Sequence, residues 1–133
     1  MATIYRECTL ALPAADAWAV LRDPLGAGRA FAGVLVDVKR DVKLDGDTRR
    51  VTFANGNVAE ERIVAIDDER MRIAYTVVGG RFEHHHASMQ IAPDAGGCCR
   101  FVWISDFLPD EARAFVEPLV DAGCAAIARN LRR

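Results

Sequence analysis

Residues 58–80, VAEERIVAIDDERMRIAYTVVGG, indicate the fold of this chain more clearly than any other stretch. Two runs that alternate in polarity, VAEERIVAI and MRIAYTVV, are separated by the charged turn Asp67-Asp68-Glu69-Arg70. The Asn55-Gly56 pair before the first run and the Gly79-Gly80 pair after the second are hairpin signals. The stretch therefore predicts a central hairpin within a longer meander of antiparallel strands.

The segments on both sides continue this pattern. Upstream, residues 34–38 alternate, a turn is expected at Asp45-Gly46, and RRVTFA forms the next strand. Downstream, RFEHHHASMQIA and CCRFVWISDFL read as strands, with a turn at residues 93–97 between them. At the amino end, residues 3–10 alternate well enough to form a first strand.

Helical spacing occurs near both ends of the chain. Pro13 begins a helix over PAADAWAVLRD, and residues 25–31 are expected to form a second short helix. Apolar residues recur at helical spacing over residues 116–131, with Asp110 as the predicted N-cap of this last helix. Pro118 is expected to kink that helix unless it begins later than Asp110.

This order of elements predicts an α+β helix-grip fold. In that fold a curved seven-stranded antiparallel sheet surrounds a long C-terminal helix, and two short helices follow strand one. Residues 1–133 are expected to form a single domain. A strongly bent sheet around one helix does not easily fill its own interior, so a ligand cavity is expected between sheet and helix.

The amino-acid composition of the chain disfavours some classes of binding partner. The 133 residues are 51% apolar and 27% charged, as in globular domains, and the net charge of −2 disfavours nucleic acid as a partner. We expect a cytoplasmic location and no stable membrane insertion, because neither an export signal nor a run of membrane-span length is visible. The four cysteines are expected to be free thiols. The sequence leaves both a monomer and a homodimer open.

The only histidines stand together in the run Glu83-His84-His85-His86. On a strand, His84 and His86 share a face and could chelate a metal, but a third ligand would have to come from a neighbouring strand. A half-exposed polar strand is therefore preferred, and no metal is expected. No nucleotide cofactor is expected either, because the glycine pairs of this chain precede strands and not helices.

Several motifs carry a resemblance to a known superfamily. The chain resembles the START-like (SRPBCC) superfamily in three segments. They are LPAADAWAVLRD, EERIVAIDDERMRIAYTVVGG, and the final Phe-x-Trp strand with Leu-Pro and a long helix. It includes polyketide cyclases, birch-pollen-allergen relatives and lipid-transfer proteins. The central hairpin is also similar to that of plant abscisic-acid receptors. That similarity implies cavity positions for Glu61 and Tyr75, and a cationic anchor at Arg29, two residues before Phe31.

Strand alternation extends this set of inward-facing residues but leaves two choices open. Ile63 and Val77 face inward if Glu61 and Tyr75 do. Strict alternation turns His85 inward, whereas one bulge would turn His84 inward, and His86 is expected to face solvent. On the last strand, either the face of Phe101, Trp103, Ser105 and Phe107 or the face of Val102, Ile104 and Asp106 is the inner one.

The expected function is binding of a small hydrophobic or amphipathic molecule in the cavity. The alternative is a polyketide cyclase/dehydratase-like enzyme with acid–base candidates Glu61, Tyr75 and Asp106. A third hypothesis is an interaction protein with a collapsed cavity. The predicted ligand-binding residues are Arg29, Phe31, Phe53, Glu61, Ile63, Tyr75, Val77, His84, His85, Ala87, Met89, Val116, Leu119, Val120 and Gly123.

Overall fold

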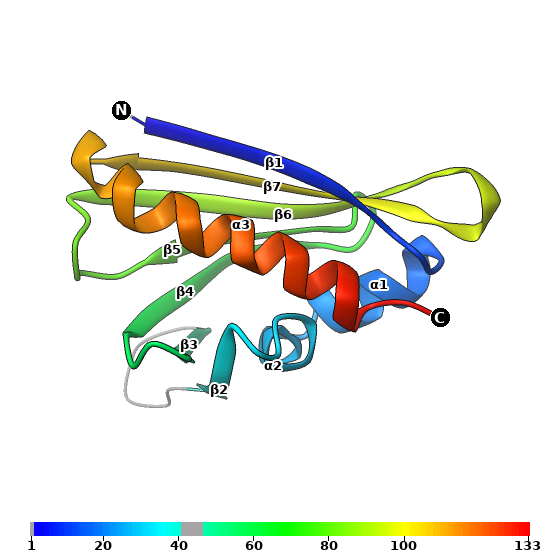
Figure 1. Ribbon diagram of the computed structural model, residues 1–133, viewed down its shortest axis with the longest axis horizontal. Coiled ribbons are helices and arrows are strands. Elements are labelled where there is room, and N and C mark those ends of the chain that lie inside the picture. The colour runs from blue at the N-terminus through cyan, green and yellow to red at the C-terminus, as the bar shows by residue number, and fades with distance from the viewer. Residues whose placement is uncertain (1, 41–46) are drawn as a thin grey trace.

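The computed structural model describes residues 2–40 and 47–133, and Figure 1 shows a sheet with a long helix across one face. The predicted turn at Asp45-Gly46 lies outside the described residues. The strands are β1 (Ala2–Leu10), β2 (Leu35–Arg40), β3 (Thr48–Phe53), β4 (Val58–Asp67), β5 (Arg72–Val77), β6 (His84–Pro93) and β7 (Cys99–Leu108). The helices are α1 (Ala14–Leu21), α2 (Ala27–Ala30) and α3 (Arg113–Asn130), and 3₁₀ turns cover Pro24–Gly26, Ala95–Gly97 and Asp110–Ala112.

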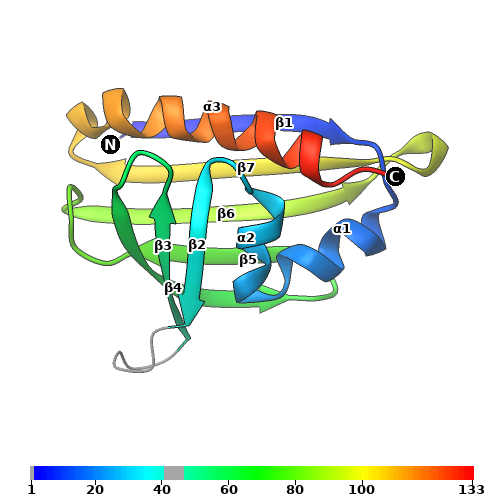
Figure 2. The same ribbon diagram turned by 60° about the horizontal axis from the view of Figure 1, so that its bottom comes forward.

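All seven strands form one antiparallel sheet in the order β1-β7-β6-β5-β4-β3-β2. The first two strands therefore lie at opposite edges, and α1 and α2 carry the chain from one edge to the other. Figure 2 shows β2 and β3 running at a steep angle to β5, β6 and β7, so the sheet is strongly curved. The predicted α+β helix-grip fold is confirmed.

The turn signals of the sequence lie where the chain reverses. Gly56, between β3 and β4, has φ +91°, and Gly79, between β5 and β6, has φ +73°. Side chains other than glycine rarely adopt such positive φ values, which explains the residue type at both turns. These two hairpins hold β3 to β6 in the order that the sequence predicts.

The start of the last helix differs from the prediction. Asp110 does not cap α3, because a 3₁₀ turn comes first and the N-cap of α3 is Ala112, which has no side-chain acceptor. Pro118 lies inside α3, and the helix continues through it to Asn130. Pro118 lacks the N–H that would bond to the carbonyl four residues earlier, so the loss is confined to one hydrogen bond.

The packed core fills one end of the space between sheet and helices. Leu10, Phe101, Ile127 and Leu131 are all fully buried there, and α1 adds Trp18 to the same cluster. Residues from β1, β7, α1 and α3 thus meet at the end where the chain terminates (Figure 2). A second buried cluster lies under the first half of α3, and the candidate site borders both clusters. The second cluster consists of Ala2, Ile4, Phe107, Ala112, Val116 and Val120.

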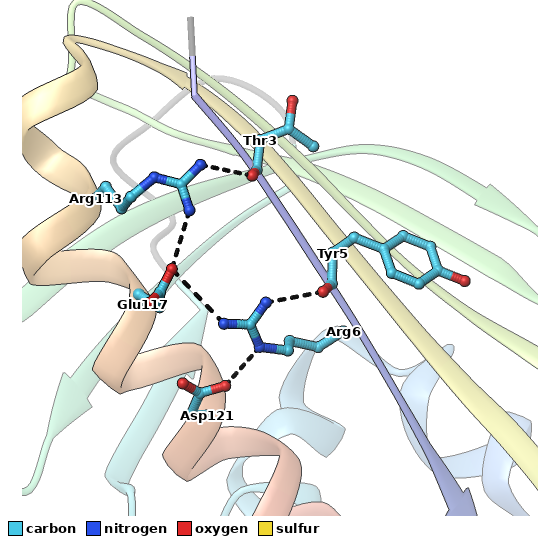
Figure 3. A network of polar contacts seen from close by, with 6 residues as sticks. All are labelled: Thr3, Tyr5, Arg6, Arg113, Glu117 and Asp121. Carbon is cyan, nitrogen blue, oxygen red and sulfur yellow. Dashed lines mark hydrogen bonds and ion pairs between the residues drawn. The ribbon is translucent and has the colours of Figure 1, made fainter.

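Charged side chains fasten α3 to the edge strand β1 (Figure 3). Arg6 Nε donates to Asp121 Oδ1 at 2.7 Å, and Arg6 Nη2 lies 3.6 Å from Glu117 Oε2. Arg113 donates to Glu117 Oε2 and to the Thr3 carbonyl, both at 2.9 Å. All of these groups are partly exposed, so the network orients α3 along the sheet more than it adds stability. No helix in the described ranges is long and apolar enough to cross a membrane.

Candidate functional site

A cavity of about 430 Å³ lies between the inner face of the sheet and α3. Its wall is built from β3 to β7, α2 and α3, and apolar side chains dominate it. The structure places most of the predicted ligand-binding residues on this wall. They are Phe31, Phe53, Glu61, Tyr75, Val77, His85, Met89, Val116, Leu119, Val120 and Gly123.

Arg49 and Glu61 form a buried ion pair on the wall. The two residues lie directly opposite each other on β3 and β4, and Arg49 Nε donates to Glu61 Oε1 at 2.9 Å. Their side chains are 4% and 11% exposed, respectively. Arg49 Nη1 also donates to the Pro24 carbonyl at 2.9 Å, and its Cζ lies 5.3 Å from the centre of the Tyr75 ring. The guanidinium is therefore held by a carboxylate, a carbonyl and an aromatic face.

The predicted cationic anchor, Arg29, is wrong. Arg29 is exposed, because α2 turns Ala27 and Ala30 toward the core and leaves Arg29 on the opposite side. The buried cation on the wall is Arg49, which the sequence interpretation did not single out. Alternation along β3 contained the signal, since Arg49, Val51 and Phe53 share a face and Phe53 was already predicted to touch the ligand.

Three other predicted ligand-binding residues do not lie on the cavity wall. His84 is exposed at the start of β6, because regular alternation without a bulge turns His85 inward. Ile63 is half-buried and packs against the core cluster away from the cavity. Ala87 is fully buried in the row between Tyr75 and Ser105 and does not border the cavity.

The inner face of β7 is the one that carries Ser105. Phe101, Ser105 and Phe107 are each at most 2% exposed, and Trp103 reaches the cavity from the same face. Asp106 therefore faces outward, where Thr3 Oγ1 donates to its carboxylate at 2.6 Å. The expectation that Asp106 could act in the cavity is wrong for this reason.

The hydroxyl group of Tyr75 on the cavity wall accepts one hydrogen bond and has its own proton free to donate. Its hydroxyl oxygen accepts a hydrogen bond from Trp103 Nε1 at 3.1 Å. Burial, and after it the nearby Glu61 carboxylate, raise the pKa of Tyr75 above its usual value, so the hydroxyl keeps its proton. Within the described part of the chain that proton has no acceptor. It is available to a molecule in the cavity.

His85 is buried and neutral. The Val77 backbone N–H donates to His85 Nδ1 at 3.0 Å, so the ring proton of the neutral imidazole is on Nε2. Burial lowers the pKa of His85 to about 4, and His86 and His84 contribute smaller effects in the same direction. The Phe82 ring, 4.8 Å away between centroids, covers one side of the imidazole. His86 is half-buried and lies opposite Asp106 on the outer face of the sheet, on the side where the sequence interpretation expected it.

Ser105 is a wall residue that the sequence interpretation left undecided. It is 2% exposed and borders the cavity. Its hydroxyl makes no hydrogen bond with any residue in the described ranges. A serine among apolar neighbours on a strand gives little indication of this position, because its face becomes known only when the strand is placed against α3.

Gly123 of α3 lies against the Trp103 side chain of β7. A Cβ atom at this position would come within 2.7 Å of the Trp103 ring, which is too close for a real contact. The room left by the glycine is therefore occupied by Trp103, not by empty cavity. This close approach fixes the indole that donates to Tyr75.

Metal binding and thiol chemistry have little support at this site. Over residues 2–40 and 47–133, no three His, Cys, Asp or Glu side chains are grouped so that they could hold a metal ion. Cys8, Cys98, Cys99 and Cys124 are free thiols, as predicted, and none of them borders the cavity.

Comparison with protein families gives one match over the whole chain. A family model described as "Polyketide cyclase / dehydrase and lipid transport" matches residues 1–133. No curated protein matches the chain.

Solved structures provide many matches to the fold. A protein from Thermobifida fusca is 26% identical, with a TM-score of 0.76, and the match covers 96% of this chain and 91% of that one. The protein XoxI from Bacillus cereus is 14% identical, with a TM-score of 0.85 and coverage of 98% and 96%. Norcoclaurine synthase from Thalictrum flavum, in complex with a transition-state analogue, is 20% identical, with a TM-score of 0.71 and coverage of 96% and 92%. At these last two identities the likeness concerns the fold alone.

Proposed function

Because this chain belongs to the polyketide cyclase/dehydrase and lipid transport family, we propose that it binds a small hydrophobic or amphipathic molecule in its cavity. The observation that carries the proposal is the cavity of about 430 Å³ with an apolar wall and a few buried polar groups. Ligand pockets in proteins commonly have this size and composition. The four free thiols favour a reducing compartment such as the cytoplasm.

An acid–base enzyme is the alternative, and the polar groups of the wall support it less well. A general base works best with a pKa near the working pH, whereas the pKa of His85 is about 4 and its Nε2 already carries a proton. The raised pKa of Tyr75 keeps that group protonated. Glu61 is engaged with Arg49. These groups are suited to holding a ligand more than to moving a proton.

Binding can be tested with N-phenyl-1-naphthylamine, a neutral probe whose fluorescence rises in apolar sites. We expect one probe per chain in the wild-type protein. Val77→Phe places a larger side chain on the wall and should weaken binding about tenfold, since overpacking costs about 1–3 kcal/mol. Val64→Phe is the matched control, because Val64 is 56% exposed and lies outside the cavity.

Two results would contradict the proposal. Absence of probe binding to the wild-type protein would favour a collapsed cavity, and equal binding by Val77→Phe and the wild type would place the probe elsewhere. Native mass spectrometry of freshly purified protein then searches for a co-purifying molecule. If wild-type protein changes the mass of that molecule and Glu61→Gln does not, the enzyme alternative is supported instead.

A further inference from the structure

Three hydrogen-bond donors on the cavity wall have no acceptor in the described part of the chain. They are the hydroxyl of Tyr75, Nε2–H of His85 and the hydroxyl of Ser105, and these residues are 4%, 6% and 2% exposed. Tyr75 and His85 use one polar atom each as an acceptor, for Trp103 Nε1 and the Val77 N–H. These donors border the cavity and are not enclosed by other side chains, so the partner that buried polar groups normally find would be a molecule in the cavity.

The sheet register brings the three donors to one part of the wall. Tyr75 pairs with Ala87 across β5 and β6, and Ala87 pairs with Ser105 across β6 and β7. The long Tyr75 side chain spans this row, since its hydroxyl reaches Trp103 on β7, two residues before Ser105. The His85 ring lies 5.9 Å from the Tyr75 ring between centroids. We refer to Tyr75, His85 and Ser105 together as the donor wall.

The buried charges of the cavity wall, Arg49 and Glu61, are engaged with each other. Arg49 pairs with Glu61 at 2.9 Å, and Glu60 Oε1 accepts from Arg50 at 2.7 Å. Glu60 Oε2 is buried and accepts no hydrogen bond from any residue that the structure describes. Arg81 borders the cavity at an exposed position, with its guanidinium 4.1 Å from the centre of the Phe115 ring. Among the described residues, an anionic ligand would therefore meet two carboxylates and a buried cation that is already paired, and Arg81 would be within its reach only at the exposed edge of the cavity.

We propose that the ligand is an uncharged apolar molecule with an oxygen acceptor, such as a ketone carbonyl, that lies against the donor wall. This inference rests on the proposed binding function and specifies the chemical class of the ligand. Each donor that meets the oxygen replaces a bond to water, whereas a carboxylate would lose its hydration without gaining a counter-charge. The wall thereby selects a neutral acceptor over an anion.

Three compounds with one ring system test this selection. 2-Acetylnaphthalene carries the carbonyl, 2-ethylnaphthalene has a similar shape without it, and 2-naphthoate is the anion at pH 7.5. Equilibrium dialysis against the wild-type protein measures the three dissociation constants. We expect the ketone to bind about five to ten times more tightly than the ethyl compound, the usual contribution of one hydrogen bond. The naphthoate should bind least tightly.

Variants of the donor wall test which residues cause the tighter binding of the ketone. Ser105→Ala and Tyr75→Phe should each bring the ketone closer to the ethyl compound in affinity and leave the ethyl compound unchanged. Ser105→Ala is the cleaner of the two, because its hydroxyl has no other bond to lose. Ser88→Ala is the matched control, since Ser88 alternates with Ala87 and lies on the other face of β6. It should bind all three compounds as the wild type does.

The dialysis results distinguish a failure of the neutral-acceptor inference from a failure of the proposed binding function. Equal affinity for the ketone and the ethyl compound overturns the neutral-acceptor inference and leaves the cavity as a binding site. Tightest binding of naphthoate also overturns it, and loss of that binding in Arg81→Gln would assign the anion to the cavity mouth. Failure of all three compounds to bind counts against the proposed function itself.

Discussion

Two sets of polar side chains are buried on the inner face of this sheet, and they differ in how much of their hydrogen-bonding capacity is used. Arg49 and Glu61 pair with each other, and Arg49 also meets a carbonyl and an aromatic face. Tyr75, His85 and Ser105 leave a donor each without an acceptor in the described part of the chain. A pair that satisfies itself contributes to the fold, whereas a donor that lacks an acceptor indicates a molecule still to come.

Removal of one member of the ion pair should have the largest effect. Arg49→Leu leaves the Glu61 carboxylate buried without its cation, so we expect the free energy of unfolding to fall by about 3–5 kcal/mol. Urea denaturation measures this change. The double variant Arg49→Leu/Glu61→Leu should recover much of the loss, because it removes both charges.

The control for this prediction is Arg50→Ala. Arg50 pairs with Glu60, and its own side chain is 52% exposed, so its loss should cost about 0–1 kcal/mol. Similar losses in Arg49→Leu and Arg50→Ala would show that burial does not distinguish the two pairs. The Arg49–Glu61 pair would then not be a special contributor to the fold, and its contrast with the donor wall would not hold.

The next effect is a pH dependence of stability that comes from His85. Its pKa is about 4 in the folded protein and about 6.5 in an unfolded chain, so the unfolded state binds more protons between these values. Stability from this group is therefore complete above about pH 6.5 and falls as the pH decreases toward 4. The full loss is roughly 3 kcal/mol, at about 1.4 kcal/mol per unit of pKa.

Urea denaturation at pH 7.5 and pH 4.5 measures this loss against a matched pair of variants. In His85→Asn an amide oxygen can still accept from the Val77 N–H, but the side chain does not titrate, so the difference between the two pH values should shrink. His84→Asn, at an exposed position, should keep the wild-type difference. An undiminished difference in His85→Asn would assign the acid sensitivity to carboxylates instead.

The smallest effect on stability is expected at Ser105. Its hydroxyl makes no bond in the described part of the chain, so Ser105→Ala should change the free energy of unfolding by no more than about 0.5 kcal/mol. Tyr75→Phe removes the acceptor of Trp103 Nε1 and should cost about 1–3 kcal/mol. A loss in Ser105→Ala as large as that in Tyr75→Phe would mean that the serine has a structural partner.

Much of the fold could be predicted because its signals are local. Asn55-Gly56 and Gly79-Gly80 lie at turns with positive φ, and polarity alternates along each strand between them. Glu61 and Tyr75 were predicted on the cavity wall from their resemblance to a known hairpin. The start of α3 was less predictable, because Asp110 is a good capping residue in any sequence but here lies in a 3₁₀ turn.

The polar chemistry of the cavity required the assembled sheet. Both Arg29 and Arg49 stand near phenylalanines in the sequence, but only Arg49 lies opposite Glu61, which is a consequence of the register of β3 on β4. The choice between Ser105 and Asp106 depends on which face of β7 meets α3. Pairing between distant segments decides such contacts, and a local pattern carries no information about them.

The sequence by itself determined the order of elements, the turns and the presence of one histidine at the cavity, because turn conformation and strand alternation are properties of neighbouring residues. The run Glu83-His84-His85-His86 shows the limit of the sequence. Burial in the assembled sheet keeps His85 neutral, and its Nδ1 accepts from the Val77 N–H of β5. The tertiary structure alone decided which donors are satisfied within the protein and which are left for a ligand, since that balance depends on contacts between strands far apart in the chain.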